Sequence, residues 1–279
     1  MPNTVTKFET FLRLHERPGL FVIPNPWDAG SARILTALGY EALATTSAGF
    51  AFSIGRQDSP TCITREQAME NARAIVDATP LPVSADLANG YGDSPEDCAE
   101  TIRLAAAAGL VGGSIEDASG DSASPIYDFQ HAVDRVAAAS EAARQLPFLL
   151  VGRAENFLWG RPDLDDTIRR LKAYSAAGAR VLFAPGLPSL EAIRTVCSAV
   201  DKPVNVVMGL KGQTYSLDEL QAAGVKRISV GGSFARAALG GFIRAAREVK
   251  EHGTFNYAKE AVPQGEVTEY MSSVTRSPK

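Results

Sequence analysis

Residues 82–93 read PVSADLANGYGD, and this stretch decides the fold. Its first four residues form a mostly apolar run typical of a buried strand, and the run ends on a carboxylate, Asp86. A Gly-Tyr-Gly turn follows at 90–92, and Ser94-Pro95 marks the start of a helix. The stretch therefore predicts a strand, a turn and a helix in succession. An acid at the end of such a strand is a candidate site residue; a carboxylate that only holds the turn is the alternative.

The same alternation of strand and helix recurs eight times along the chain. The strands are short apolar runs, as expected when both faces of a parallel sheet are buried, and most helices end at glycine. Eight units favour a closed α/β barrel, the (β/α)8 TIM barrel, over an open doubly wound sheet. The expected strands are 20–24, 41–45, 82–86, 111–116, 147–153, 180–185, 203–207 and 226–230.

Both ends of the chain extend beyond this repeat. Residues 1–19 predict an extra N-terminal helix, in which Phe8 and Phe11 lie at helical spacing. Residues 252–279 are polar and carry no strand pattern, so we expect a C-terminal helical tail that packs against another subunit. The predicted organisation is a single barrel over residues 1–251 followed by this tail.

The composition indicates a globular protein with a full hydrophobic core. Of the 279 residues 45% are hydrophobic, and the formal net charge is −4 without a cluster of basic residues. This charge argues against a nucleic-acid or membrane partner. The three cysteines, Cys62, Cys98 and Cys197, are widely spaced, which is typical of free thiols. No segment approaches about 18 consecutive apolar residues and no signal-peptide pattern is present, so we expect a cytoplasmic protein.

Polar side chains gather just after the expected strands. In a barrel of this kind the active site lies at the carboxyl ends of the strands, so these side chains should share one mouth. None of the three histidines is among them, which disfavours a serine or cysteine triad. The candidates are Asn25, Trp27, Asp28, Thr45, Thr46, Ser47, Asp86, Glu116, Asp117, Arg153, Glu155, Asn156, Pro185, Asn205 and residues 231–233.

Two carboxylates from neighbouring strands indicate a metal site. Asp86 and Glu116 offer hard oxygen ligands, which suit Mg²⁺ held partly by waters and completed by substrate oxygens. A hydrogen-bonded carboxylate pair is the alternative. Arg153, at the end of its strand, is placed to bind a carboxylate or phosphate group through two hydrogen bonds. Its alternative role is an ion pair with Glu155 or Glu116.

Two turns of small residues offer backbone N–H groups to an anion. The first is residues 46–49, for which a tight turn is an equally good explanation. The second is residues 231–233, for which a glycine turn with Ser233 as a helix N-cap is the commoner explanation.

Five motifs, in this order and at these spacings, carry a resemblance to a known superfamily. They read LFVIPNPWDAGSARIL, ALATTSAGFAFSIGRQD, VSADLANGYGD, GGSIED and VGRAEN, and the similarity covers roughly residues 20–235. The chain resembles the isocitrate lyase and phosphoenolpyruvate mutase superfamily, especially its phosphonomutase-like branch. The resemblance implies a (β/α)8 barrel, assembled as a dimer or tetramer with an exchanged C-terminal helix. It also implies a 2-oxo acid or its enolate bound on Mg²⁺, and a carbon–carbon or carbon–phosphorus bond made or broken beside the carbonyl.

The same resemblance implies roles for individual residues. Asp86 and Glu116 match the acids of the metal site, and Asp58 falls where the superfamily has another acid near the metal-bound waters. Arg153 matches the arginine that binds substrate, and Asn205 matches an asparagine on the substrate side. The segment that binds the substrate carboxylate corresponds to Thr46, Ser47, Ala48 and Gly49.

The sequence departs from the superfamily pattern at three places. A second acid usually follows the first by two positions, but here that position is Ala88, which weakens the case for tight metal binding. The mobile loop expected over the site, residues 117–127, contains no cysteine or lysine, so it supports neither a cysteine acid/base step nor lysine-assisted phosphoryl transfer. Residues 184–186 read Ala-Pro-Gly where relatives offer a glutamate or histidine.

The reaction that survives these losses is cleavage of a carbon–carbon bond. Decarboxylation of a 2-oxo diacid such as oxaloacetate needs only a Lewis acid and a carboxylate clamp. Retro-aldol cleavage, as in 2-methylisocitrate lyase, also needs a base, for which Asp58 or Glu116 is the candidate. We therefore expect a lyase that uses Mg²⁺, or alternatively Mn²⁺, on a small carboxylate substrate. Phosphonopyruvate hydrolase or mutase chemistry and a non-catalytic 2-oxo acid binding protein are the alternatives.

Overall fold

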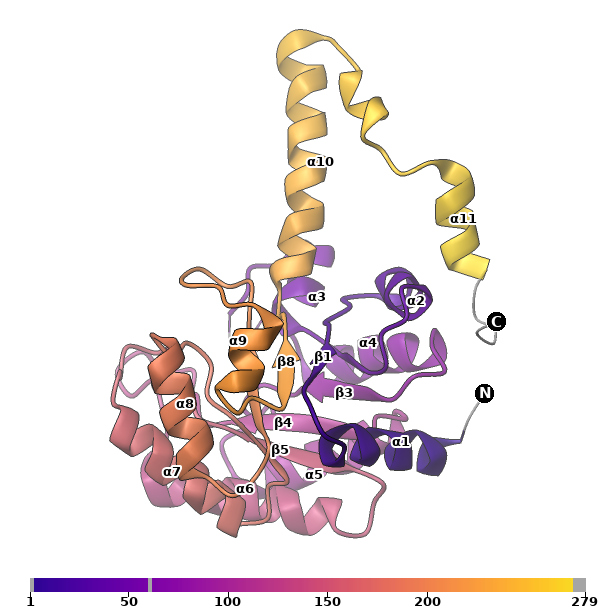
Figure 1. Ribbon diagram of the computed structural model, residues 1–279. Helices are drawn as coiled ribbons and strands as arrows, with labels where there is room; N and C mark the ends of the chain where they lie inside the picture. The colour runs from indigo at the N-terminus through magenta and orange to yellow at the C-terminus, as the bar shows by residue number, and fades with distance from the viewer. Residues whose placement is uncertain (1–2, 60–61, 273–279) are drawn as a thin grey trace.

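The computed structural model describes residues 3–59 and 62–272, with a parallel eight-stranded sheet at its centre. The strands are β1 (Phe21–Ile23), β2 (Leu43–Ala44), β3 (Val83–Asp86), β4 (Gly112–Glu116), β5 (Leu149–Arg153), β6 (Val181–Phe183), β7 (Val204–Val207) and β8 (Arg227–Ser229). They pair in the order β1-β8-β7-β6-β5-β4-β3-β2, and a 3.0 Å hydrogen bond from Ala44 N to Pro24 O joins the two edges. The sheet thus forms the (β/α)8 barrel expected from the sequence (Figure 1).

Helices alternate with the strands and cover the outside of the barrel (Figure 1). Thr64, Ser94 and Ser216 each begin a helix with a reciprocal capping box, which is why the sequence located these starts well. The helices are α1 (Thr4–Glu16), α2 (Ala29–Ala37), α3 (Ser47–Ser53), α4 (Arg65–Asp77), α5 (Pro95–Ala107), α6 (Phe129–Ala143), α7 (Leu164–Ala176), α8 (Leu190–Ala199), α9 (Leu217–Ala222) and α10 (Ser233–His252).

Helix α3 follows β2 directly and begins within residues 46–49, for which a tight turn was considered. Thr46 is its N-cap and accepts a hydrogen bond from Gly49 N at 3.3 Å. A β-carbon at Gly49 would lie 2.7 Å from Thr46 Cγ2 and 3.0 Å from Trp27 Cβ, so only glycine fits this close packing. The expectation for Ser233 was also wrong, because Gly232 is the N-cap of α10 and no side chain caps that helix.

Helix α1 closes the amino-terminal end of the barrel. Phe11 and Leu14 pack with interior strand residues such as Phe21, Leu149 and Val181 in one buried cluster. A second and larger cluster joins the outer faces of the strands to the surrounding helices. The extra N-terminal helix expected from the sequence therefore acts as the floor of the barrel, and the interior opens at the opposite end, where the candidate site residues lie.

Helix α10 leaves the barrel and carries the C-terminal tail with it (Figure 1). The chain turns at Gly253, continues through the short 3₁₀ helix η1 (Asn256–Lys259), and returns as α11 (Gln264–Ser272) towards α2. The main-chain oxygen of Met271 accepts a hydrogen bond from Arg33 there. The final seven residues of the predicted tail, 273–279, lie outside the described residues. Within residues 3–59 and 62–272, no helix combines the length and apolar character needed to cross a bilayer.

Candidate active site

Three charged side chains meet at the carboxyl ends of β3, β4 and β5. Glu116 and Arg153 are register partners on neighbouring strands, and Asp86 ends the strand on the other side of β4. Adjacent parallel strands lie about 4.8 Å apart, so side chains that end them necessarily converge. The sequence-based expectation that these residues share one mouth follows from this geometry.

Arg153 is the centre of the cluster. Its Nη1 lies 3.4 Å from Asp86 Oδ1 and 3.2 Å from Glu116 Oε2, and its Nε donates to Glu155. The guanidinium carbon also stands 4.9 Å from the ring centre of Phe183. The ion-pair role considered for Arg153 is therefore present, although its Nη2 donates no hydrogen bond to the described residues. These surrounding carboxylates raise the pKa of Arg153 despite burial, so its charge is permanent.

The carboxyl groups of the cluster outnumber the one guanidinium among them. Burial raises the pKa of Glu116 well above its ordinary value, and the pKa of Glu155 is raised for the same reason. Partial burial, followed by repulsion from Asp86, raises the pKa of Asp58. These raised pKa values reflect the cost of ionising closely spaced acids together. A further cation beside Arg153 would favour their ionised forms.

A cavity of about 190 Å³ opens beside this cluster. Of the nine residues to which the superfamily resemblance gives a role, seven line it, whereas Glu116 and Gly49 do not. Glu116 does not line the cavity, but it forms an ion pair with Arg153, which does. Gly49 packs against Trp27, behind the residues that line the cavity. The seven are Thr46, Ser47, Ala48, Asp58, Asp86, Arg153 and Asn205.

Helix α3 fixes the direction of the Asp86 carboxylate. Ser47 donates to Asp86 Oδ2 through its hydroxyl at 2.8 Å and its backbone N–H at 3.3 Å. On the other side, the backbone N–H of Ala88 lies 3.3 Å from Asp86 Oδ1. Ala88 and Tyr91 both have positive φ, 47° and 59°, an uncommon conformation for non-glycine residues. Residues 87–91 (LANGY) thus form a turn that lies around the end of β3.

Asp117 and Asn25, two other strand-end candidates, have structural partners. Asp117 is buried and accepts hydrogen bonds from Arg170 Nη1 at 3.0 Å and Tyr174 OH at 2.6 Å. Asn25 bonds to Thr45 O at 2.9 Å and to Val230 N at 2.8 Å, which ties the ends of β1, β2 and β8 together. Both residues hold the mouth of the barrel in shape.

The loop of residues 117–127 is folded as a small hairpin beside the site. Ala118 and Ile126 form an antiparallel bridge, and Ser119 N donates to Pro125 O at 3.0 Å. Ser119 and Gly120 border a different cavity, near Asn89 and Tyr91, and no residue of this loop lines the 190 Å³ cavity. Closure of the loop over the site stays a prediction.

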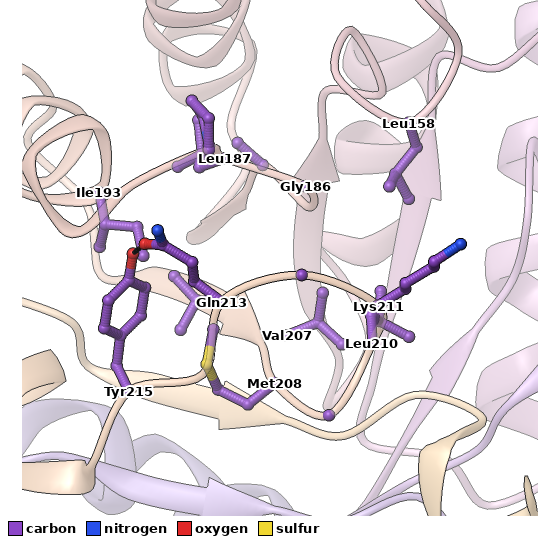
Figure 2. Close-up of a pocket in the computed structure, with 15 residues that line it drawn as sticks. Leu158, Gly186, Leu187, Ile193, Val207, Met208, Leu210, Lys211, Gln213 and Tyr215 are labelled. Atoms are coloured by element: carbon purple, nitrogen blue, oxygen red, sulfur yellow. Dashed lines mark hydrogen bonds between the residues drawn. The ribbon is translucent and has the colours of Figure 1, made fainter.

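A second cavity, of about 160 Å³, adjoins the first and shares Leu158, Val207 and Leu210 with it. It lies between the segment after β6 and the loop after β7 (Figure 2). Figure 2 shows Lys211 and Leu158 at one side of this cavity and Tyr215 with Ile193 at the other. The Ala-Pro-Gly segment after β6, which lacks the acid or histidine of relatives, contributes its Ala184 and Gly186 to the wall.

The donor set fits a divalent ion that is held mainly by water. Within the described ranges, no three His, Cys, Asp or Glu side chains are grouped to hold a metal. The protein would therefore supply Asp86 and Glu116, which approach the same Arg153 nitrogen, and leave other positions to water and substrate oxygens. Mg²⁺ is commonly bound in this way, through one or two carboxylates plus substrate. Ala88 has no side-chain oxygen to offer the ion; its backbone N–H donates to Asp86 Oδ1 instead.

Comparison with known proteins identifies the family of the chain. The family model described as phosphoenolpyruvate phosphomutase matches residues 11–250. The chain belongs to the phosphoenolpyruvate phosphomutase family. A solved structure from Burkholderia cenocepacia J2315, described as a lyase/mutase, is 56% identical, with a TM-score of 0.94 and 97% of each chain covered.

Two relatives that are named as lyases are more distant. The 2-methylisocitrate lyase of Escherichia coli K12 is 28% identical over 255 residues, covering 88% of this chain and 82% of that protein. The solved structure of 2,3-dimethylmalate lyase, named as a member of the PEP mutase/isocitrate lyase superfamily, is 27% identical with a TM-score of 0.85; the match covers 97% of this chain and 95% of that one. The superfamily resemblance drawn from the sequence motifs is confirmed, and the chain is an enzyme of the lyase and mutase class.

The sequence analysis anticipated one further feature of the site and missed another. Glu155, a strand-end candidate and a possible ion-pair partner of Arg153, is 1% exposed and accepts a hydrogen bond from Arg153 Nε. Arg227, at the start of β8, was not considered, yet it lines the cavity. The available signal for Arg227 was a charged residue inside a strand that is otherwise buried.

Proposed function

We propose that this chain is a Mg²⁺-dependent lyase that cleaves a carbon–carbon bond of a small 2-oxo or 2-hydroxy carboxylate through a pyruvate enolate. The observation that carries the proposal is the buried Arg153 guanidinium, placed among Asp86, Glu116 and Glu155 beside a cavity of small-molecule size. A fixed positive charge next to hard oxygen ligands suits a reaction in which negative charge develops on a substrate oxygen.

Asp86 and Glu116 would hold the ion, with Ser47 keeping Asp86 in its orientation. When bound, the ion supplies a Lewis acid for the oxygen on which enolate charge develops. Arg153 binds the substrate carboxylate through Nη2, the nitrogen that the surrounding acids leave available, and Ala48 and Ser47 form the adjacent wall. Asn205 lies deeper in the same cavity, where it contacts Arg227 rather than the mouth.

In this proposal Asp58 acts as the base. It lines the cavity, and its raised pKa follows from partial burial and from repulsion by Asp86. A carboxylate with a raised pKa accepts a proton more readily than an ordinary aspartate, which retro-aldol cleavage of a 2-hydroxy acid requires. Decarboxylation of a 2-oxo diacid needs no such base, so the dependence on Asp58 distinguishes the two reactions.

The experiment that tests the function is pyruvate release from a substrate panel, coupled to NADH oxidation by lactate dehydrogenase. Oxaloacetate, 2-methylisocitrate, dimethylmalate and phosphonopyruvate are compared with Mg²⁺, with Mn²⁺ and with a chelator. We expect metal-dependent release of pyruvate from one of the three substrates without phosphorus. The second product then identifies the bond that is broken. Phosphate or an isomerised product from phosphonopyruvate would instead favour carbon–phosphorus chemistry.

The matched variants are Asp86→Ala at the site and Asp201→Asn at an exposed position after α8. We expect Asp86→Ala to abolish metal-dependent turnover and Asp201→Asn to retain it. Full activity and metal dependence in Asp86→Ala would remove Asp86 from the metal site. Tight Mg²⁺-dependent oxalate binding without turnover of any substrate would indicate a binding protein rather than a lyase.

A further inference from the structure

Arg227 is a buried cation without a counter-ion. It begins β8, is 4% exposed, and its side chain lines the same 190 Å³ cavity as Asp86 and Arg153. Burial lowers its pKa to about 9, and no described carboxylate offsets this effect. Arg153 differs in this respect, because its three acidic neighbours raise its pKa. An uncompensated guanidinium in a barrel interior is costly and requires an explanation.

The neighbours of Arg227 orient it without neutralising it. Its Nε donates to Asn205 Oδ1 at 2.8 Å, and Asn205 Nδ2 in turn donates to Ser229 Oγ at 3.1 Å. Nη1 is buried without a hydrogen-bond partner in the described structure, and Nη2 also donates to none of those residues. Two donor groups of one fixed guanidinium thus lack acceptors.

On the floor near Arg227, the ring of His15 has aromatic neighbours and the further cations Lys226 and Arg180 around it. Phe11 and Phe21 pack against the ring of His15, which lies edge-on to both. Burial, assisted by the charge of Arg227, lowers the pKa of His15 to about 3, so the imidazole is neutral near pH 7. Neither His15 nor any described carboxylate therefore offsets the charge of Arg227, and the cavity side is open to a compensating anion.

The barrel interior leaves room for such an anion. Interior positions of these barrels are usually filled by bulky branched side chains. Here Ala44, Ser84, Ser114 and Ser229 line the cavity between the mouth and Arg227. Because these side chains are small, the cavity continues inwards from the acids at the mouth to Arg227 near the floor.

We propose that Arg227, oriented by Asn205, forms a second carboxylate-binding subsite that receives the distal carboxylate of a dicarboxylate substrate. The inference rests on the proposed function and narrows its substrate class from carboxylates in general to dicarboxylates. One carboxylate end engages the mouth, where Arg153 lies, and the other reaches the deeper guanidinium. Planar, bidentate pairing with a carboxylate satisfies Nη1 and Nη2 together.

The test compares two acids of the same chain length, malate and 2-hydroxybutyrate, which differ only in the distal carboxylate. Dissociation constants are measured by calorimetry with Mg²⁺, without turnover, and oxalate serves as a probe of the mouth alone. We expect the wild type to prefer malate by about 10- to 100-fold, the range of a charge-assisted hydrogen-bonded contact. Arg227→Met should remove this preference while leaving 2-hydroxybutyrate and oxalate binding unchanged.

Two further variants separate the subsite from a general effect on folding. Arg227→Lys keeps the charge and should retain part of the preference for malate. Asn205→Asp places a carboxylate against Arg227 at nearly constant size, so it should remove the preference without loss of thermal stability. If the wild type binds the two acids equally, or if Arg227→Met keeps the preference for malate, the inference about the subsite is wrong. In either case, binding of oxalate by the wild type would leave the proposed function intact. Failure of oxalate to bind the wild type would count against both.

Discussion

Asp86 has hydrogen-bond donors on both of its oxygens before any ligand arrives. Ser47 holds Oδ2, and Arg153 with the backbone of Ala88 approaches Oδ1. Because these contacts fix the carboxylate, Ser47→Ala should weaken metal affinity by about 10- to 100-fold, the usual effect of losing a residue that orients a ligand. Titration of Mg²⁺ or Mn²⁺ monitored by calorimetry measures it. Ser53→Ala, at an exposed position of the same helix, is the matched control and should leave the affinity unchanged.

Replacing Asp58 by asparagine should lower activity but raise stability. Its folded-state pKa is raised above 3.8, so the stability that it contributes is full below that value and is lost as pH rises through the folded pKa. Asp58→Asn cannot ionise and should therefore melt at a higher temperature than the wild type near pH 7, with the two melting points converging in acid. If the substrate is a 2-hydroxy acid, the same variant should lose activity by about 10²- to 10⁴-fold. Identical melting curves at both pH values would contradict the raised pKa.

At the scale of single residues, the sequence identified most of the charged groups of the site. Asp86, Glu116 and Arg153 were predictable together because strand ends of a parallel barrel meet at one mouth. The pairing of Arg153 with Glu155 was available only as an alternative, because no periodicity encodes how a side chain two residues past the strand turns back. Arg227 was overlooked because a charged residue at the start of a strand is usually exposed.

Helix α3 is the element that couples the fold to the site. A methyl group at Gly49 would meet Thr46 Cγ2, Trp27 Cβ and Ala235 Cβ at 2.7, 3.0 and 3.3 Å. Gly49→Ala should therefore displace the helix and cost about 1–3 kcal/mol, as overpacking of a close-packed site usually does. Because Ser47 would move with the helix, catalytic efficiency should fall too. Thermal or denaturant unfolding and kinetics measure the two effects.

The control for this change is Gly265→Ala in α11, where a β-carbon would meet nothing within 4 Å. That variant should unfold at or slightly above the wild-type midpoint, since alanine favours a helix over glycine. Equal stability of the two variants would show that α3 adapts to the added methyl. Helix α3 itself was not predicted, because seven residues rich in Ala, Gly and Ser give too short a pattern to distinguish a helix from a turn.

On the scale of the whole molecule, α10 projects away from the barrel, and the tail returns to it at α11 (Figure 1). The large apolar residues along α10 are exposed, with Phe242 at 70% and Ile243 at 44%. Beyond the helix, Phe255 is 64% exposed and Val262 is 55% exposed. Large exposed apolar side chains, when they gather into a patch, usually mark a protein interface. The sequence analysis expected the tail to pack on another subunit, and the exposed face of α10 extends that expectation to the helix itself.

This surface predicts a dimer or tetramer assembled through α10. Placing a charge at its most exposed aromatic, Phe242→Asp, should shift the protein towards monomers, because the carboxylate would have to be buried in the interface. Size-exclusion chromatography with light scattering measures the mass. The matched control is Val5→Asp, because Val5 is an apolar residue of α1 that is 54% exposed and lies at the amino-terminal end of the barrel. The barrel core does not involve Phe242, so circular dichroism should show both variants folded. A wild-type mass equal to one chain, or an unchanged assembly in Phe242→Asp, would exclude α10 as the interface.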